Sequence, residues 1–580
     1  MNTQTTPTPD EFLTAIEDEE GLVYSADGKK LLACTNPYLT VCSIRSGTEI
    51  ICDGAFYMPD DEANNLCQLL RIELPYTIQY IGAEAFMSCA ELAYINIPMS
   101  VREIGAAAFS GCAQLKIDSQ NPRFKFENET LTDVGNNTLI AYLGSEAEVT
   151  VADGIQAIGD GAFTCNTNLL AISMPDTVTC IGNSAFSMCN NMQTVSVGNG
   201  LQHLGEKAFH MCYALERIAL PDTLKEIGKM AFENCAALQE VKFPATLEII
   251  GTQAFNKCDE LRRITLPTTL KTIGDEAFGL CKLAGEIVLP PSVEMLGRCA
   301  FRFCYDLTRI VIPASVKEIG GGVFNGCTSL EVTSESQRFV VVDNEMLIDT
   351  ADNTLLSCFK SSGENNILIW NKFEIPSHVT HIADYAFAHA MFSSLTIPES
   401  ISFIGKYAFE SCMALDRITL PPTITELSEG LFSGSGLYSY TVKSQIKKIG
   451  GYAFKSCFSL RSIQMEPGVM DIGDEAFSMC YDLQEVQLAP TVKTIGNSAF
   501  ARCEKLQQIT LPDTVEDLGE YAFACCESLE RVRLSPNIKN INADTFYGCN
   551  ALEQIVVPRG YELKYRDLLG EDLAGLVVGE

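Results

Sequence analysis

One phenylalanine recurs along most of this chain of 580 residues, usually at steps of 23 residues. It follows alanine or stands in the equivalent place, at positions 56, 86, 109, 163, 186, 209, 232, 255, 278, 301, 324, 387, 409, 432, 454, 477, 500, 523 and 546. A fixed period of roughly 20 to 50 residues is the signature of a solenoid, whose coils are too small to bury their own apolar faces and stack on one another. The repeat predicts about 19 coils of ~23 residues, in blocks of three, eight and eight.

The segment LQEVKFP at 238–244 shows the expected course of one coil. Val241 and Phe243 face one way while Glu240 and Lys242 face the other, as a half-buried strand requires. We expect this strand to pair with its copies in a parallel sheet on the concave face. The proline that follows stops the pairing, and a later glycine allows a backbone bend. Phe, Cys and Leu then recur at intervals of three, which predicts a short helical or 3-10 turn on the other side.

A small hydroxyl or amide recurs just before the bend's first apolar residue. The column contains Thr223, Thr246, Thr269, Ser292, Ser315, Thr423, Thr514 and Asn537. Such a side chain can satisfy backbone groups of the neighbouring loop that a tight turn would otherwise leave without a partner. We therefore predict hydrogen bonds from this column to the adjacent coil.

A second unit separates the blocks of coils. Its copies are EGLVYSADGKKLL (20–32), NETLTDVGNNTLI (128–140) and NEMLIDTADNTLL (344–356). Apolar runs flank turn residues in each copy, which predicts three β-hairpin insertions. The C-terminal stretch breaks the pattern and resembles a cap over the last coil. The predicted order is an N-terminal segment with the first hairpin unit (1–47), three coils (48–115), the second hairpin unit (116–155), eight coils (156–330), the third hairpin unit (331–378), eight coils (379–557) and the cap (558–580).

These coils resemble the BspA-like, bacterial-surface type of leucine-rich repeat, which reads roughly L-P-x-x-V-x-x-I-G-x-x-A-F-x-x-C-x-x-L-x-x-I-x. LPDTVEDLGEYAFACCESLERVRL at 511–534 matches that pattern almost letter for letter, and the resemblance covers about residues 48 to 557. It implies a right-handed leucine-rich repeat solenoid and non-enzymatic binding, often at the surface of host-associated bacteria or parasitic protists. Members of that kind usually carry an export signal and an anchor.

Most of the 24 cysteines occupy the position three residues after the repeated phenylalanine. The spacing of stacked coils is close to what a disulfide can bridge, but the column also contains Asn166, Ala390 and Ser435, as a packing position can. No Cys-x-x-Cys pair is present to begin a zinc site. We therefore interpret the column as free thiols that pack as small hydrophobic groups. The core ladder is typified by Phe232, Cys235, Phe255, Cys258, Phe477 and Cys480.

Composition narrows the classes of partner. A formal net charge of −33 repels a polyphosphate backbone, and the sequence has no basic patch to offset it, so we expect no nucleic-acid partner. No apolar run reaches the roughly 18 residues that a membrane span needs, so we expect no membrane insertion. The absence of an export signal and the many reduced thiols favour the cytoplasm, whereas the resemblance implies a cell-surface or secreted protein.

Catalytic motifs do not stand out. The sequence has no Gly-x-Ser-x-Gly motif, phosphate-binding loop or dinucleotide fingerprint, and we expect no enzyme activity and no cofactor. Three of the five histidines lie close in sequence, at His378, His381 and His389. Their positions in the coil need not converge, so we expect surface histidines and no metal site. A metal-dependent accessory or an enzyme with a site near the third hairpin unit stays the alternative.

The outward side of the strand ladder is the candidate binding surface. Its third position alternates in charge through successive coils, as Arg217, Glu240, Arg263, Glu286 and Arg309. Opposite charges on neighbouring strands stabilise a sheet by roughly 0.2 to 1 kcal/mol per pair, so the column can be a self-neutralising ladder or a polar platform for a partner. The fifth position adds a threonine stripe that includes Thr265 and Thr419.

The first functional hypothesis is a non-catalytic recognition or adhesion scaffold that binds a protein or glycoprotein along an elongated concave face. The acidity of the chain favours a basic partner and a salt-dependent association. A structural spacer, in which length matters more than any one face, is a further alternative. The sequence leaves the identity of the partner and the oligomeric state open.

Overall fold

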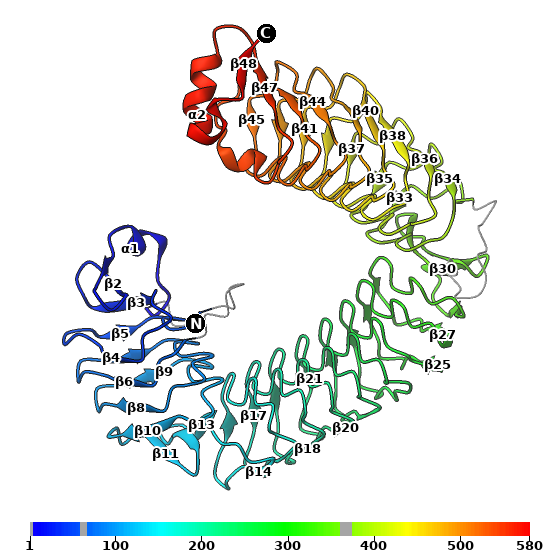
Figure 1. The fold of residues 1–580 in the computed structure, drawn as a ribbon. Helices are drawn as coiled ribbons and strands as arrows, with labels where there is room; N and C mark the ends of the chain where they lie inside the picture. Colours follow the sequence, from blue (N-terminus) through cyan, green and yellow to red (C-terminus); the bar gives the residue numbers. More distant parts are fainter. Residues whose placement is uncertain (1–3, 59–66, 360–373) are drawn as a thin grey trace. The chain divides into compact units, whose positions relative to one another are not determined.

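A computed structural model describes residues 4–58, 67–359 and 374–580. The chain divides into two compact units, which we describe separately. Unit 1 contains Met1–Leu283 and Pro290–Met295, and unit 2 contains Ala284–Leu289 and Leu296–Glu580. Each unit is a stack of similar coils joined by parallel strands (Figure 1). The predicted leucine-rich repeat solenoid with parallel sheets is confirmed, whereas the count of 19 coils stays a prediction.

Each coil contributes to two parallel ladders of strands. The first ladder contains the predicted strands, such as β20 (Arg217–Ala219) and β22 (Glu240–Lys242). The second ladder contains two-residue strands just before the bend glycine, such as β21 (Glu226–Ile227) and β23 (Ile249–Ile250). The sequence predicted only a bend at these residues. The coil therefore has a second line of backbone pairing that the sequence analysis missed.

The strands of unit 1 fall into these two ladders and two antiparallel groups. The remaining first-ladder strands are β4 (Val41–Ser43), β6 (Arg71–Glu73), β8 (Tyr94–Ile97), β10 (Lys116–Ser119), β14 (Glu148–Thr150), β16 (Ala171–Ser173) and β18 (Thr194–Ser196). The remaining second-ladder strands are β5 (Ile50–Ile51), β7 (Tyr80–Ile81), β9 (Glu103–Ile104), β15 (Ala157–Ile158), β17 (Cys180–Ile181), β19 (His203–Leu204) and β24 (Thr272–Ile273). The antiparallel strands are β1 (Ile16–Glu17), β2 (Leu22–Tyr24), β3 (Lys30–Cys34), β11 (Phe124–Glu127), β12 (Thr130–Asp133) and β13 (Thr138–Tyr142), and helix α1 is Pro9–Leu13.

Unit 2 repeats the arrangement with one antiparallel group. Its first-ladder strands are β25 (Gly285–Val288), β27 (Leu307–Ile312), β29 (Glu331–Ser334), β34 (Ser394–Thr396), β36 (Arg417–Thr419), β38 (Ser439–Val442), β40 (Ser462–Met465), β42 (Glu485–Gln487), β44 (Gln508–Thr510), β46 (Arg531–Arg533), β47 (Gln554–Val557) and β48 (Val577–Gly579). Its second-ladder strands are β28 (Glu318–Ile319), β33 (His381–Ile382), β35 (Phe403–Ile404), β37 (Glu426–Leu427), β39 (Lys448–Ile449), β41 (Asp471–Ile472), β43 (Thr494–Ile495) and β45 (Asp517–Leu518). The others are β30 (Phe339–Val342), β31 (Met346–Asp349), β32 (Thr354–Cys358), the 3-10 helix η1 (Ala543–Phe546) and helix α2 (Glu562–Ala574), while β26 (Met295–Leu296) has one residue in each unit.

The bend glycine is needed because two backbones approach closely there. A Cβ atom on Gly228 would lie 2.6 Å from the carbonyl oxygen of Gly205 in the preceding coil. The same atom on Gly274 would lie 2.6 Å from the backbone nitrogen of Thr252. Gly228 and Gly274 do not have positive φ values, so the predicted reason, a special bend conformation, is wrong for them. Close packing of the second ladder selects the glycine.

The predicted helical turn is replaced by a tight non-helical turn in most coils. Met230 and Asn234 flank Phe232 at two residues on either side, with φ of 55° and 59°. Left-handed residues so close together interrupt a right-handed helix. Within the described residues, η1 of the last coil is the one 3-10 helix. The turns around the repeated phenylalanine, which we call the turn column, are instead held together by backbone hydrogen bonds between coils. One example is the bond from Phe232 N to Ala254 O at 2.8 Å.

The core is a ladder of stacked rings and buried thiols. The ring centroids of Phe232 and Phe255 lie 5.2 Å apart at an interplanar angle of 7°. Phe232, Cys235, Phe255, Cys258, Phe477 and Cys480 are all fully buried. All 24 cysteines are free. Most thiols of the column donate to the carbonyl of the phenylalanine one coil earlier, as Cys235 Sγ does to Phe209 O at 3.1 Å. Cysteine therefore fills space and also satisfies a buried carbonyl, and the second role was not predicted.

The predicted hydroxyl column forms the expected bonds between coils. The Thr246 hydroxyl donates to Leu224 O at 3.0 Å and to Asp222 O at 2.7 Å. Thr269 contacts Leu247 O in the same way at 2.8 Å. This prediction is confirmed, and its physical basis is the need to satisfy the carbonyls of a tight buried turn.

Antiparallel strands lie at the three segments of the second repeated unit. β1, β2 and β3 pair antiparallel, as do β11, β12 and β13, and β30, β31 and β32. The last strand of each group then pairs in parallel with the second ladder. Residues 360–373 of the predicted third hairpin unit lie outside the described residues.

An arginine–aspartate pair, in which the aspartate is buried and the arginine is half-exposed, anchors two of these groups. Arg123 Nη2 lies 2.6 Å from Asp133 Oδ2, and Arg338 Nη2 lies 2.7 Å from Asp349 Oδ2. Each arginine also donates to a carbonyl of the preceding coil, at Arg102 (2.6 Å) and Lys317 (2.7 Å). The bidentate geometry, with Nε bonded to the other carboxylate oxygen, makes these strong charge-assisted contacts.

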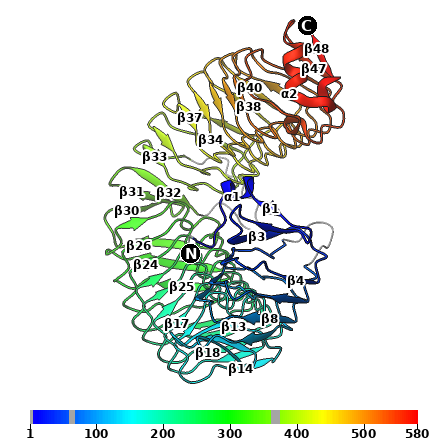
Figure 2. The same ribbon diagram turned by 90° about the vertical axis from the view of Figure 1, so that its left-hand side faces the viewer.

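The C-terminal residues extend and cover the last coils. β48 pairs in parallel with β47, and α2 lies beside β48 (Figure 2). Tyr565 and Leu569 of α2 are buried, and the Lys564 ammonium donates to Ile538 O at 2.7 Å. No helix in the described part of the chain is long and apolar enough to cross a membrane.

Candidate recognition surface

At two places in the first ladder, outward residues of opposite charge lie on neighbouring strands, as the alternating pattern predicted. In unit 1, Arg217 of β20 is the register partner of Glu240 of β22, and both side chains are exposed. In unit 2, Glu286 of β25 is the partner of Arg309 of β27. The Arg309 guanidinium lies 3.5 Å from the Glu286 carboxylate. Self-neutralisation is therefore seen at Glu286 and Arg309, whereas Arg217 and Glu240, though adjacent, form no ion pair within the described residues.

Arg263 and Thr265 do not belong to the ladder as predicted. Residues 261–266 form no strand, and the hydrogen-bonded sheet of unit 1 ends at β22. Both side chains are exposed. In this coil, Arg262 and not Arg263 forms an ion pair, with Glu260 at 3.1 Å. Thr419, by contrast, is an exposed residue of β36, where the prediction placed it.

A second column of alternating charge lies beside the second ladder and was missed by sequence reasoning. Lys225, Glu248, Lys271 and Glu294 occupy the same place in successive coils of unit 1. Lys271 Nζ lies 2.6 Å from Glu248 Oε2, and this pair lowers the pKa of Glu248 and raises that of Lys271. In unit 2, Lys539 pairs with Glu516 at 2.9 Å. The 23-residue spacing of these charges was a signal that could have revealed this column.

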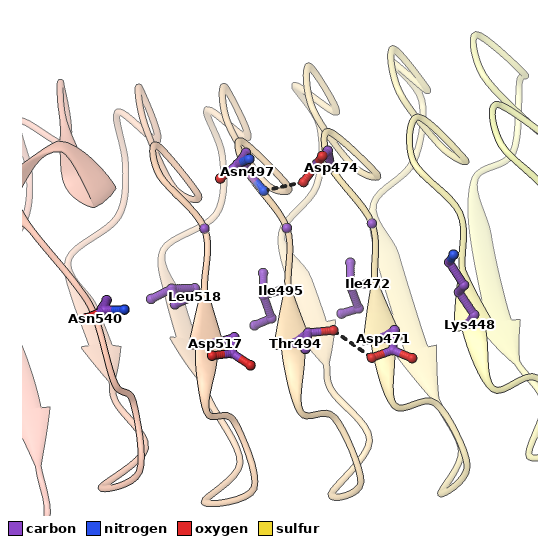
Figure 3. Close-up of a pocket in the computed structure, with 13 residues that line it drawn as sticks. Lys448, Asp471, Ile472, Asp474, Thr494, Ile495, Asn497, Asp517, Leu518 and Asn540 are labelled. Atoms are coloured by element: carbon purple, nitrogen blue, oxygen red, sulfur yellow. Dashed lines mark hydrogen bonds between the residues drawn. The ribbon is translucent and has the colours of Figure 1, made fainter. Parts of the chain in front are cut away.

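A hollow on the second-ladder side of unit 2 has a volume of about 520 Å³ and is shown in Figure 3. Asp471, Asp474 and Asp517 lie around it. Asp471 accepts a hydrogen bond from the Thr494 hydroxyl and Asp474 accepts one from Asn497 N, both at 2.7 Å. These two carboxylates bridge adjacent coils.

The three clustered histidines do not converge. His378 is exposed, and His381 lies on β33 with its Nδ1 2.8 Å from the Thr380 hydroxyl. His389 is half-buried, and its Nε2 lies 2.7 Å from Arg302 Nη2. Burial, together with the Arg302 charge, lowers the pKa of His389 to about 4. Across residues 4–58, 67–359 and 374–580, no group of three or more His, Cys, Asp or Glu side chains is arranged to hold a metal ion.

Comparison with known proteins places the repeats in a family. The model of the BspA type leucine rich repeat region (6 copies) matches residues 57–141, 137–262, 202–331, 358–484 and 470–565. No curated protein matches the chain.

Solved structures of bacterial proteins are similar to the chain. One is a leucine rich cell surface protein from Faecalibacterium prausnitzii A2-165, with 24% identity, a TM-score of 0.37, and 78% of this chain and 99% of that chain covered. A leucine-rich repeat protein from Bacteroides ovatus has 25% identity, a TM-score of 0.30, and 77% and 96% covered. A third, from Eubacterium ventriosum, has 18% identity, a TM-score of 0.42, and 68% and 92% covered. Because the family model spans well over half of the sequence, the chain belongs to the BspA type leucine rich repeat family.

Proposed function

We propose that the protein is a non-catalytic recognition or adhesion scaffold that binds a protein or glycoprotein along the outward face of its first ladder. Membership of the BspA type family suggests a protein-binding or adhesion scaffold, and leucine-rich repeat families are generally non-enzymatic. The choice of face is our own inference from the charges on the two ladders.

One observation carries that choice. On the second-ladder side, Lys271 and Glu248 neutralise each other across adjacent coils. On the first ladder, Arg217 and Glu240 are exposed register partners that form no ion pair within the described residues. Charges already paired gain little from a new partner, whereas unpaired charges held on a rigid sheet are available to one. The first ladder therefore offers the more favourable surface for recognition.

The chemistry of the partner follows from the charge of the chain. A net charge of −33 steers a basic protein toward the surface and makes the association weaker at high salt. The same charge opposes binding of nucleic acid. Specificity would come from the local pattern of arginine, glutamate and threonine, including Thr419, and not from the overall field.

Charge reversal tests this surface. Arg217→Glu and Glu240→Lys, singly and together, would be compared in quantitative affinity capture from the native cell. We expect each single reversal to reduce recovery of the captured partner at least tenfold, with at most a slight fall in the unfolding temperature from like charges on neighbouring strands. The double exchange restores opposite charges and should remove that fall. The matched control is the double variant Lys271→Glu with Glu248→Lys, which keeps opposite charges at the two positions of this second-ladder ion pair. Unchanged capture by every first-ladder variant would refute the assignment of this face.

A further inference from the structure

Among the consecutive coils from β33 to β47 of unit 2, one junction lacks strand pairing in both ladders. The coil that contains β35 and β36 is followed by the coil that contains β37 and β38. The second ladder breaks between β35 and β37, and the first ladder breaks between β36 and β38. Every other junction between consecutive coils from β33 to β47 keeps pairing in at least one ladder. We name this place the β36/β38 junction.

The break in the second ladder coincides with a serine at a glycine position. Gly450, one coil later, donates its N–H to Leu427 O at 2.8 Å, and a Cβ on it would lie 2.7 Å from that oxygen. Ser428 carries such a Cβ. Its backbone N–H makes no corresponding bond to Ile404 O within the described residues, and its hydroxyl donates to that carbonyl instead. A Cβ alone does not prevent the backbone bond, because Ala383 at the equivalent place donates its N–H to Leu355 O at 2.9 Å. At Ser428 the hydroxyl instead takes the carbonyl that the backbone N–H would otherwise use.

The first ladder is open at the same junction. In the next coil, Arg461 N donates to Tyr438 O at 2.8 Å, but the described residues contain no equivalent bond from Tyr438 N to Asp416 O. A hollow of about 310 Å³ lies between β36 and β38, lined by residues that include Thr419 and Thr441.

The core of this coil also differs from its neighbours, because a tyrosine replaces a buried isoleucine. Tyr440 occupies a position that holds isoleucine at 418 and 463 in the neighbouring coils. Its ring lies 5.4 Å from those of both Phe432 and Phe454, at tilted angles. Phe432 and Phe454 are themselves tilted by 35°, whereas Phe454 and Phe477 stack at 6°. A wider core residue thus lies where the strands separate.

The turn column stays intact across the junction. Phe409 N donates to Leu431 O at 3.0 Å, and Ser411 N donates to Ser433 O at 2.7 Å. Two coils joined along one edge and open along two ladders have the geometry of a hinge. Paired coils must break several backbone–backbone bonds to separate, whereas the described residues of these two coils form none in either ladder. On the second-ladder side, the hydroxyls of Thr423 and Ser428 reach across, to Ile401 O and Ile404 O.

We propose that the β36/β38 junction is a hinge of the third block, at which the two coils open and close reversibly about the turn column. Ser428 sets the open form through its hydroxyl, which occupies Ile404 O in place of the backbone N–H and limits the opening by holding that carbonyl. The proposal does not depend on which face binds a partner.

Hydrogen exchange of the intact protein tests the hinge, because it measures opening amide by amide. The amides of Ser428 and Tyr438 should exchange at least tenfold faster than their counterparts one coil later, Gly450 and Arg461. Ser428→Gly should slow exchange at residue 428 at least tenfold by restoring the bond. Ser428→Ala keeps the Cβ and removes the hydroxyl, so exchange should slow as well, because alanine at the equivalent position 383 makes the corresponding bond.

A reverse variant supplies the matched control. Gly473 donates to Ile449 O at 2.9 Å, and a Cβ there would lie 2.5 Å from Gly451 N. Gly473→Ser should speed exchange at its own junction without changing the β36/β38 junction. Equal exchange at residues 428 and 450 in the native protein, or fast exchange that persists in Ser428→Gly, would overturn the proposal.

Discussion

The two ladders of each coil use the same repeat in different ways. The first ladder has longer strands and exposed outward residues, and the adjacent charges of Arg217 and Glu240 stay unpaired. The second ladder has two-residue strands, glycines in close backbone contact and a charge column that pairs with itself. This difference supports our proposal that the second ladder mainly holds the stack together and that the first ladder is the surface for recognition.

The largest expected effect comes from the core that both ladders share. Phe232→Ala would remove a fully buried ring that stacks between Phe209 and Phe255, and we expect a loss of about 3–5 kcal/mol in the free energy of unfolding. Urea unfolding would measure it. Tyr213→Ala, at a side chain that is 43% exposed, is the control and should cost far less. Equal losses would contradict a core centred on the phenylalanine column.

Substitution at a bend glycine should destabilise the protein more than a substitution on the first ladder. Gly228→Ala places a methyl group 2.6 Å from Gly205 O, and we expect a loss of about 1–3 kcal/mol in unfolding free energy. Ala219→Ser, on the exposed side of β20, is the first-ladder control and should change little. A neutral Gly228→Ala variant would show that close approach does not select glycine in the second ladder.

The arginine–aspartate pair should make the hairpin end of the second ladder sensitive to pH. Burial alone would raise the pKa of Asp349, but its hydrogen bonds from Arg338 and Ala351 outweigh burial and hold it below the ordinary 3.8. The pair therefore stabilises the fold above that pH and loses its contribution as the pH falls through the lowered value. Arg338→Gln should cost about 1–2 kcal/mol at pH 7, because the arginine is 45% exposed and partly screened by solvent.

Urea unfolding from pH 2 to 7 would check this prediction. The difference in stability between wild type and Arg338→Gln should shrink as Asp349 becomes protonated. Arg309→Gln, which breaks an exposed first-ladder pair, is the control and should show a smaller difference at pH 7. A difference that grows toward low pH would contradict the assigned direction of the pKa shift.

The smallest expected effect is on the paired charge column. Lys271→Glu would place a carboxylate between Glu248 and Glu294, and we expect a slight fall in Tm that disappears at high salt. Arg217→Glu on the first ladder faces one carboxylate, Glu240, and breaks no ion pair among the described residues, so it should lower Tm less. Differential scanning calorimetry at low and high salt would distinguish them, and a larger fall for Arg217→Glu would reverse the roles of the two ladders.

The sequence predicts what repeats strongly and misses what does not. The phenylalanine and cysteine columns, exemplified by Phe232 and Cys235, follow from a period that stacking imposes. The second ladder was missed because two residues before a glycine are too few to show strand alternation. Arg338 and Asp349 lie on different strands, so their contact depends on pairing that spacing alone does not reveal. Arg263 was misplaced because the pattern continues where the strand does not.

The most direct test of the comparison is photo-crosslinking in the native cell from one residue on each ladder. A photoreactive phenylalanine analogue would replace Arg217 on the first ladder or Glu226 on the second, both exposed. We predict a discrete crosslinked partner from position 217 and none from position 226. A partner captured from position 226 and not from position 217 would contradict it.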